Sequence, residues 1–455
     1  MLTRLTRINF KYLVELVLWR SGSKPTVHQS LNISSGENAK NGGDVSLQAP
    51  TPPTAIPLGQ ILRKLPSLFP RTFTKSYEDY KMFWQDSEKF QRDLLETLPM
   101  FSSSGASDKI GRILKVDVDN EGNYINEVCI SPKNPAKNLK HVVFVHGYGA
   151  GLGFFLKNLE HLSLPNNEWC IHAIDMPGFG YSSRPRFPFN YPQATQDEVH
   201  NWFHTRLRTW FSKRGLLDRP QENLVVAHSL GAYVMALYAN KHPTDFKKLV
   251  MCSPAGVCHS GNIDKGNLNP KIQKHASMSP PWWYVKLWDR NISPFTIVRS
   301  AGPLGSKITS GWSYRRFKKL LHSGKHGRIL DATQFETLHR YSYGIFNRPG
   351  SGEYLLAFAL SCGGNPRNAL EETIFREPSK TDHFKARCDW VWMYGENDWM
   401  NRNGGKRISD NLNKAFGVGK SSFSIVPGAG HHLYFDNYTF FNKKILEEME
   451  QLNRN

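Results

Sequence analysis

The chain has 455 residues and a formal net charge of +19, because 58 Lys and Arg stand against 39 Asp and Glu. That length excludes a small disulfide-stapled scaffold and allows one large domain with appendages, or two domains. Hydrophobic residues at 39% and aromatic residues at 12% supply a sizeable core, which excludes wholesale disorder. No run of about 18 uncharged apolar residues occurs, so a membrane-spanning helix is not expected, and the basic excess favours a nucleic acid or an anionic membrane as partner.

Residues 1–24 form a basic, amphipathic pattern. They hold five Lys and Arg against one acid, Glu15, and four leucines fall on one arc of a helix drawn at about 100° per residue. An Arg-rich, acid-poor N-terminal helix is typical of a mitochondrial transit peptide, whereas a basic helix that stays on a membrane surface is the alternative. We therefore expect a mitochondrial protein that is peripheral to the inner membrane.

Segment 25–75 is rich in Ser, Asn, Gly and Pro and holds few apolar residues. Such a segment cannot bury enough surface to order itself, so we predict a disordered linker. Aromatic and aliphatic residues then recur at helical spacing over 77–98. This helix opens the first part of the predicted core, residues 76–256.

The core alternates strands with helices. The turn Asn120-Glu121-Gly122-Asn123 between two strand-like runs predicts a hairpin. The alternation predicts an α/β fold with a mostly parallel central sheet, helices on both faces and the chemistry at the C-terminal strand ends. The predicted strands are 114–118, 124–130, 141–145, 169–174, 224–227, 248–252, 390–394 and 422–426, and the predicted helices are 195–214, 231–240, 407–416 and 439–452.

Residues 257–385 interrupt this alternation before the core resumes over 386–455. They hold 19 Lys and Arg against 9 Asp and Glu, a net charge of +10, together with many aromatic residues. An aromatic, basic insertion at this place predicts a helical cap, or lid, over the site. The alternative is a helical subdomain whose aromatic residues form its own core, and both interpretations can hold together.

The charge of the cap predicts docking on an anionic bilayer. Trp282, Trp283 and Trp288 would seat at the interface, and each basic residue near an anionic surface contributes roughly 1 kcal/mol. A merely solvated helix face is the alternative, where surface charges matter little. The residues expected to contact lipid head groups are Arg315, Arg316, Lys318 and Lys319.

Ser229 lies in the sequence Leu224–Gly231, which reads as an apolar strand, a serine in a tight turn and the start of a helix. This context is typical of a nucleophile elbow, in which the serine oxygen is exposed at the top of the sheet. Ala227 stands where the first glycine of G-x-S-x-G is usual, and alanine is the next smallest residue. The alternative for Ser229 is a plain helix N-cap.

A serine nucleophile needs a base that an acid orients. In chain order after Ser229, Asp398 follows one predicted strand and His431 follows the next. We predict Asp398 as the acid, with Glu396 as runner-up. His431 is favoured over the adjacent His432 as the base, because the glycine-rich approach ends at it.

The tetrahedral intermediate of acyl transfer needs two backbone N–H donors. Leu230, after the nucleophile, and Tyr148, in a glycine-rich turn after the first long strand, are the candidates. That turn could instead hold a dinucleotide phosphate, but its spacing departs from G-x-G-x-x-G and no acid lies at the expected distance for a ribose. Asp175, which closes the following strand, is interpreted as part of a structural turn.

The six cysteines are scattered without any C-x-x-C pair. This argues against a disulfide framework or a zinc module and indicates a reducing compartment. We expect no metal and no organic cofactor. No nucleic-acid-binding module is recognisable either, so we expect no nucleic-acid partner.

Several of these motifs together resemble the α/β-hydrolase family. More narrowly, they resemble its lipid-modifying branch, which includes fungal mitochondrial cardiolipin deacylases, lysophosphatidate acyltransferase relatives and the animal lipid-droplet lipase coactivator. The coactivator members lack the nucleophilic serine, so the presence of Ser229 favours an active enzyme. The motifs are the turn 146–151, Asp175-x-x-Gly178-x-Gly180-x-Ser182, 227–231, 395–399, 428–436 and the cap segment 293–305.

The same branch carries an H-x-x-x-x-D motif tied to acyltransferase activity. His431 and Asp436 match it here, which the resemblance implies as a possible acyltransferase pair. The spacing recurs at His259…Asp264 and His326…Asp331 inside the cap, so it is weakly specific. His431 already belongs to the predicted triad, which leaves bracing of the loop as the alternative role for Asp436.

These observations lead us to expect a serine hydrolase that deacylates an anionic phospholipid such as cardiolipin in mitochondria. The expected partners are the phospholipid substrate and an anionic membrane surface. Transfer of the acyl group to a lysophospholipid, such as lysophosphatidate, is the enzymatic alternative. A non-catalytic lipid-surface scaffold like the coactivator is the alternative of another class.

Deleting residues 1–24 tests the targeting hypothesis. We expect the truncated protein to remain in the cytosol, because the basic amphipathic segment would supply the import signal. Fractionation of cells that express tagged full-length and truncated chains measures this. Import of the truncated chain at the full-length level would contradict the hypothesis.

Overall fold

The computed structural model of the chain describes residues 67–102, 107–259, 282–290, 292–321, 329–362, 364–376, 385 and 387–454. The predicted transit peptide, 1–24, and the linker up to residue 66 lie outside the described residues. Within the described part, no helix combines the length and the apolarity needed to cross a membrane.

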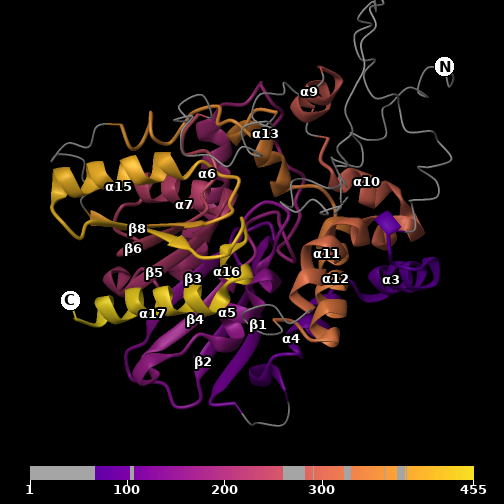
Figure 1. Cartoon of the computed structure of the whole chain (residues 1–455), viewed down its shortest axis with the longest axis horizontal. Coiled ribbons are helices and arrows are strands. Elements are labelled where there is room, and N and C mark those ends of the chain that lie inside the picture. The colour runs from indigo at the N-terminus through magenta and orange to yellow at the C-terminus, as the bar shows by residue number, and fades with distance from the viewer. Residues whose placement is uncertain are drawn as a thin grey trace, which may run out of the picture.

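One sheet runs through the described part of the chain, and Figure 1 shows it at the centre of the core. Its order is β1-β2-β4-β3-β5-β6-β7-β8. β1 pairs with β2, and β2 with β4, in antiparallel fashion, whereas the pairs from β4 to β8 are parallel. The strands are β1 Lys109–Asp117, β2 Tyr124–Pro132, β3 Lys140–Val145, β4 Trp169–Ile174, β5 Asn223–His228, β6 Lys248–Cys252, β7 Asp389–Gly395 and β8 Ser421–Val426.

The predicted hairpin is confirmed between β1 and β2. Gly122 has φ +76°, a left-handed conformation that glycine adopts without steric cost. Val118 N–H donates to the carbonyl of Asn123 over 2.8 Å, which closes the turn. The mostly parallel sheet is confirmed as well.

Helices cover both faces of the sheet because its side chains alternate between two apolar clusters. Val142 and Phe144 of β3 belong to one cluster, and Val143 and Val145 belong to the other. The first cluster includes residues of α5 and α17, and the second includes residues of α6, α7 and α15. The helices are α5 Leu156–His161, α6 Gln196–Lys213, α7 Leu230–Lys241, α15 Arg402–Phe416, α16 Leu433–Asp436 and α17 Tyr438–Arg454.

Helix α15 begins five residues before its predicted start at 407. The glycine pair Gly404-Gly405 lies inside the helix. A Cβ at Gly405 would lie 2.5 Å from Tyr394 Oη, so the missing side chain lets the helix approach β7 closely. The Asn401 side chain caps the start by accepting from Asn403 N–H over 3.0 Å.

The cap is helical, as predicted, and it also holds the N-terminal helices. Figure 1 shows α3, α10, α11 and α12 grouped beside the core. α3 packs on α11, and α4 packs on α12, so these two helices belong to the cap and not to the core as predicted. The bounds are α3 Phe73–Asp86, α4 Lys89–Leu95, α9 Trp282–Asp289, α10 Phe295–Ser300, α11 Gly305–Leu321, α12 Ala332–Asn347 and α13 Leu355–Ala359.

The single helix predicted over 77–98 is two helices. α3 ends at Asp86, and α4 begins at Lys89 after a two-residue break. The Asp86 side chain accepts from Lys89 N–H over 3.2 Å at the start of α4. Short 3-10 turns join the other elements. They are η1 Pro99–Phe101, η2 Leu152–Phe155, η3 Pro165–Asn167, η4 Pro220–Glu222, η6 Gly302–Leu304 and η7 Gly352–Tyr354.

The predicted linker is wrong for residues 67–75, which are ordered. Arg71 is 2% exposed, and its guanidinium donates to Asp79 at 2.6 Å and to Glu336 of α12 at 3.1 Å. A buried arginine with two carboxylate partners ties this segment to the cap. The Ser-, Asn- and Pro-rich composition that indicated disorder ends before this ion-pair network begins.

The last part of the predicted cap returns to the core. Leu355, Phe358, Leu370 and Phe375 belong to the apolar cluster beneath α6, and α13 packs against α6. The boundary predicted at residue 385 is therefore too late. The strand–helix alternation could not reveal this, because a five-residue helix leaves little periodic signal.

The cap aromatics mostly form internal packing. Trp288 is 7% exposed and donates its Nε1–H to the carbonyl of Leu360 over 3.1 Å, so the prediction that it seats in a membrane interface is wrong. Trp312 packs against Phe154 and Phe317 with ring centroids 6.0 and 5.6 Å away. The side chains of Trp282, Trp283, Lys318 and Lys319 lie outside the described residues.

Candidate active site

Ser229 occupies the turn between β5 and α7 at the C-terminal end of the sheet. Its φ of 52° and ψ of −116° are a strained conformation for a residue with a side chain. The turn requires close approaches nearby, because a Cβ at Gly231 would lie 2.2 Å from the carbonyl oxygen of His146. Ala227 sits buried between Val145 and Met251 of the flanking strands, where its methyl group is accommodated.

His431 and Asp398 complete a hydrogen-bonded line with Ser229. His431 Nε2 lies 3.1 Å from Ser229 Oγ, and His431 Nδ1 lies 3.1 Å from Asp398 Oδ1. The Asp398 side chain is 2% exposed and the His431 side chain 15% exposed. The line runs from a buried carboxylate through an imidazole to a hydroxyl, the geometry that general-base activation of a serine requires.

Glu396 and His432, the alternative acid and base, have other partners and do not complete the line with Ser229. Glu396 is exposed, and its carboxylate accepts from Gly428 N–H over 2.7 Å instead of contacting His431. His432 is half-buried, and its Nδ1 accepts from Arg316 Nε over 3.3 Å. Burial, together with the nearby Arg316 charge, holds the pKa of His432 well below its usual value, so this imidazole stays neutral. The geometry therefore places His431, which the sequence favoured from its position in the loop, beside Ser229, and turns His432 towards Arg316.

The predicted oxyanion-hole residues flank Ser229. Leu230 is the first residue of α7, so its N–H belongs to the free N-terminal turn of the helix. Tyr148 follows Gly147, whose backbone packs directly on the nucleophile turn, because a Cβ there would lie 2.8 Å from Ser229 Cβ. The Tyr148 ring lies 5.3 Å from that of Phe295, which places cap helix α10 beside the same turn.

Two contacts of His431 were missed by sequence reasoning. His228 donates Nε2–H to the carbonyl of His431 over 2.9 Å, and the Trp399 ring centroid lies 4.9 Å from the imidazole. Burial and the neighbouring His431 hold the pKa of His228 well below its usual value, so it acts as a neutral donor. In the sequence, His228 directly precedes Ser229 and Trp399 directly follows Asp398, and only these positions could have indicated that the two residues contact His431.

Asp175 has the structural role that was predicted. Its Oδ1 accepts from Leu152 N–H over 2.8 Å, and its Oδ2 accepts from Tyr181 N–H over 2.7 Å. His146 accepts from Met176 N–H over 3.1 Å. These bonds join the two glycine-containing turns at the strand ends, so Asp175 fixes the backbone that carries Tyr148.

Asp436 braces the loop that carries His431. Its Oδ2 accepts from Gly430 N–H over 3.0 Å, and its Oδ1 accepts from Arg316 over 2.7 Å. Arg316 comes from cap helix α11, and its side chain is 12% exposed. The prediction that Arg316 contacts lipid head groups is therefore wrong, since it joins the cap to the histidine loop.

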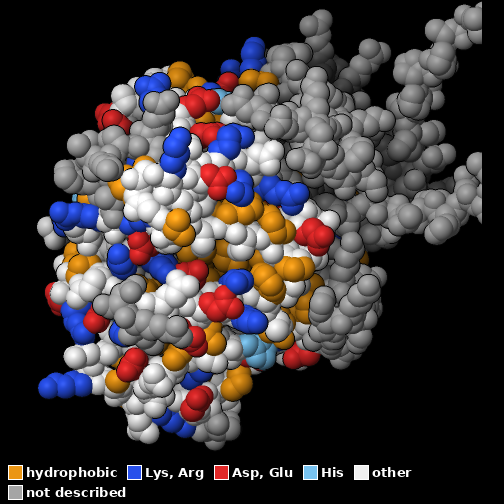
Figure 2. All heavy atoms as spheres, turned by 60° about the vertical axis from the view of Figure 1, so that its left-hand side comes forward, with side chains coloured by type: hydrophobic (Ala, Val, Ile, Leu, Met, Phe, Trp, Pro, Cys, Tyr) orange, Lys and Arg blue, Asp and Glu red, His pale blue; other side chains and the backbone are white. Residues whose placement is uncertain are grey.

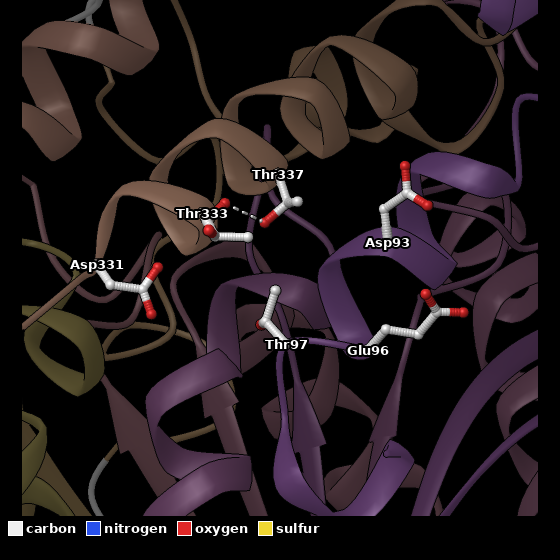
Figure 3. Close-up of a pocket in the computed structure, with 6 residues that line it drawn as sticks. All are labelled: Asp93, Glu96, Thr97, Asp331, Thr333 and Thr337. Carbon is white, nitrogen blue, oxygen red and sulfur yellow. Dashed lines mark hydrogen bonds between the residues drawn. The ribbon is translucent and has the colours of Figure 1, made fainter. Parts of the chain in front are cut away.

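A separate cavity of about 450 Å³ lies between α4 and the start of α12 (Figure 3). Asp331 accepts from Gln334 N–H over 2.7 Å as the cap of α12, and Asp93 pairs with Lys89 over 2.5 Å. An acidic, open cavity is unsuited to an acyl chain or a phosphate, and Asp331, which ends the His326…Asp331 match in the sequence, serves here as a helix cap. The cavity is lined by Asp93, Glu96, Thr97, Asp331, Thr333 and Thr337.

Comparison with known proteins agrees with this architecture. Residues 140–438 match the family described as the alpha/beta hydrolase fold. The chain belongs to that family. The match spans the sheet from β3 to β8 and includes the nucleophile turn, the cap insertion and the loops that carry Asp398 and His431.

The curated relatives act on lipids. The chain is 29% identical to a 1-acylglycerol-3-phosphate O-acyltransferase of Arabidopsis thaliana, with 72% of this chain and 70% of that protein covered. It is 26% identical to the (lyso)-N-acylphosphatidylethanolamine lipase of Bos taurus, with 71% and 83% covered. It is 25% identical to a 1-acylglycerol-3-phosphate O-acyltransferase of Saccharomyces cerevisiae, with 71% and 85% covered. The chain is thus an α/β hydrolase of the lipid-modifying branch, as the sequence resemblance implied.

Replacement of the two acids separates their roles. Asp398→Asn should lower kcat for ester hydrolysis by about 10⁴, because the amide would hold the imidazole in the wrong tautomer. Glu396→Gln, the matched control two residues away, should change kcat less than threefold, since its carboxylate meets only Gly428 N–H. Steady-state kinetics on a soluble p-nitrophenyl ester measure both. Equal losses in the two variants would contradict the assignment.

Proposed function

We propose that the protein is a serine acyl hydrolase that removes a fatty acyl chain from an anionic phospholipid, with cardiolipin in mitochondria as the expected substrate. The observation that carries this proposal is Ser229 in a strained turn, with His431 Nε2 3.1 Å from its oxygen and Asp398 behind the imidazole. The lipid-acting relatives and the basic N-terminal segment support the substrate class and the compartment.

The proposed reaction proceeds in two halves. Ser229 Oγ attacks the ester carbonyl while His431 Nε2 takes its proton, and the N–H groups of Tyr148 and Leu230 stabilise the oxyanion. Asp398 holds the imidazole and stabilises its protonated form. His431 then passes the proton to the leaving glycerol oxygen, which leaves an acyl-enzyme. A water molecule, activated by His431, releases the fatty acid and restores the serine.

Transfer of the acyl group is the second candidate function. It is favoured by the acyltransferases of Arabidopsis thaliana and Saccharomyces cerevisiae among the relatives. In this reaction a lysophosphatidate hydroxyl would replace water as acceptor of the acyl-enzyme. Asp436 would then serve as a positioning residue, because it braces the His431 loop through Gly430 and does not itself contact Ser229.

Lipid mass spectrometry of the purified protein tests both activities. Vesicles of cardiolipin, phosphatidate or phosphatidylcholine would be incubated with and without lysophosphatidate and acyl-CoA. Ser229→Ala should lower release and transfer of acyl chains by at least about 10³ and prevent labelling by a fluorophosphonate, because both reactions pass through the same acyl-enzyme. Ser182→Ala, a buried serine of the Asp175 turn, is the control that keeps the label.

The outcomes distinguish the functions. Free fatty acid without new phosphatidate indicates hydrolysis, and new phosphatidate indicates transfer. Unchanged turnover in Ser229→Ala would overturn the serine mechanism. A protein that binds vesicles equally with and without Ser229, and that turns over none of the lipids, would be a scaffold.

Helix α3 offers the surface that we propose for membrane contact. Three of its aromatic side chains face outward, with Phe73 57%, Tyr77 44% and Trp84 69% exposed, while Ser76 and Asp79 are buried. A surface helix usually buries its apolar face, but in α3 Met82 and Phe83 pack against the core while these three rings stay exposed. Exposed aromatic rings on an amphipathic helix are suited to the head-group region of a bilayer.

Neighbouring features extend this surface. Leu304 of η6, which packs on α3, is 45% exposed, and the Lys81 ammonium lies 5.1 Å from the Tyr77 ring centroid. A lysine beside an interfacial ring is complementary to anionic lipid. By contrast, Figure 2 shows basic and acidic side chains interspersed over the face it presents. We therefore assign membrane contact to α3 in place of the cap tryptophans.

Vesicle sedimentation tests this surface. Phe73→Ala with Trp84→Ala should lower the partition into cardiolipin vesicles at least tenfold, because each ring loses its apolar contact with the bilayer. Val418→Ala is the control, since Val418 is an exposed apolar residue that lies in the loop between α15 and β8. Hydrolysis of a soluble ester should stay unchanged. Equal partition of the double variant and the control would contradict the assignment.

A further inference from the structure

Soft metal-ligating side chains gather on the sheet beneath α6, outside the site described above. Cys129 of β2, Cys170 of β4 and His172 of β4 each present one donor atom, and the three atoms lie within 4.8 Å of one another. The two sulfur atoms are 3.3 Å apart and are not bonded to each other. Cys170 and His172 are buried, and Cys129 is half-buried.

Strand register brings these residues together. Cys129 stands directly opposite His172 in the antiparallel β2–β4 pair, and His141 stands beside Cys170 in the parallel β3–β4 pair. Residues two apart on a strand share a face, so Cys170 and His172 point the same way. The four side chains therefore come from three adjacent strands and face one side of the sheet.

His141 lies on the other side of the His172 ring and is not one of the three residues whose donor atoms gather within 4.8 Å of one another. Its Nδ1 lies 2.9 Å from Nε2 of His172, so the two rings share a single proton between facing nitrogens. The other nitrogen of His172, Nδ1, lies 2.7 Å from the Glu127 carboxylate. A carboxylate behind a histidine fixes the ring and its tautomer, which is the usual support of a metal-bound imidazole.

We propose that Cys129, Cys170 and His172 bind one Zn²⁺ ion, with a water molecule as the fourth ligand. Zinc prefers thiolate and imidazole ligands in tetrahedral sites, where bonds of about 2.0–2.3 Å put neighbouring donors roughly 3.3–3.8 Å apart. The separation of 3.3 Å between the sulfurs agrees with these values. The metal replaces His141 as the partner of the His172 ring, and the two thiol protons are released to solvent.

The charges around the cluster suit this ion. Two thiolates and one neutral imidazole neutralise a divalent cation. Glu127 is matched separately by Arg214, whose Nε donates to its carboxylate over 3.2 Å, and Trp210 donates Nε1–H to the same carboxylate over 2.9 Å. Arg214 also reaches Cys129 Sγ at 3.6 Å, a contact that favours the thiolate.

The site is structural and not catalytic. His141 is the second residue of β3 and Cys170 the second of β4, so the cluster lies toward the N-terminal ends of these strands. The acyl chemistry lies at the opposite, C-terminal ends, after β5, β7 and β8. The ion would join β2 to β4, where the sheet changes from antiparallel to parallel pairing.

Cobalt substitution and metal analysis test the proposal on the untagged full-length protein. Purified wild type should contain one equivalent of zinc by mass spectrometry of its metals. After removal of zinc with a chelator, one equivalent of Co²⁺ should produce thiolate-to-cobalt charge-transfer absorption and the intense visible bands of a tetrahedral ion. Zinc should also raise Tm of the stripped protein.

Variants separate this site from adventitious binding. Cys129→Ser should lower the bound metal at least tenfold and remove the charge-transfer band, whereas Cys362→Ser, another half-buried cysteine, should keep both. Soluble-ester hydrolysis serves as the folding control. If Cys129→Ser does not fold, the charge-transfer absorption of the cobalt-loaded wild type tests by itself whether thiolates bind the metal. Stripped wild type without the charge-transfer band, or an intact mass lacking two hydrogens through a Cys129–Cys170 disulfide, would overturn the proposal.

Discussion

The close backbone contact at the end of β5 is the constraint on which the rest of the site depends. Ser229 adopts a φ of 52°, and a conformation of this kind costs about 1–3 kcal/mol unless its surroundings impose it. Here β5 is buried along its whole length between β3 and β6, and Ser229 N–H donates to the carbonyl of Cys252 over 2.9 Å. Gly147 and Gly231 remove the side chains that would otherwise separate the two turns.

The remaining residues of the site reach Ser229 because parallel strands end at one edge. β7 and β8 lie next to each other in the sheet, so the loops after them deliver Asp398 and His431 side by side. The loop of His431 is held from three directions, by His228 at its carbonyl, by Asp436 at Gly430 N–H and by Arg316 through Asp436. The last contact couples the cap to the position of the imidazole.

Part of the excess positive charge of the chain forms ion pairs within the folded protein. Arg71 pairs with Asp79, and Arg184, whose pKa burial lowers to about 10, lies 3.7 Å from Glu353. Arg316 likewise faces Asp436. A net charge counted over the cap therefore overstates what a membrane would meet, and the exposed aromatic rings of α3 become the better indication of a lipid-facing surface.

The sequence by itself determined the α/β architecture, the serine turn and the order of acid and base. These features are local, since strand periodicity, small residues around Ser229 and glycines before His431 are each read within a few positions. The sequence favoured His431 over His432 and Asp398 over Glu396 from their places in the loops. Only the tertiary structure shows the contacts, His431 with Ser229 and Asp398 with His431, because these residues come together from distant parts of the chain. It also decided that Trp288 is buried, that α3 is exposed and that Cys129, Cys170, His141 and His172 meet. Burial and strand register are properties of neighbours distant in sequence, and the spacing of residues along one chain does not record them.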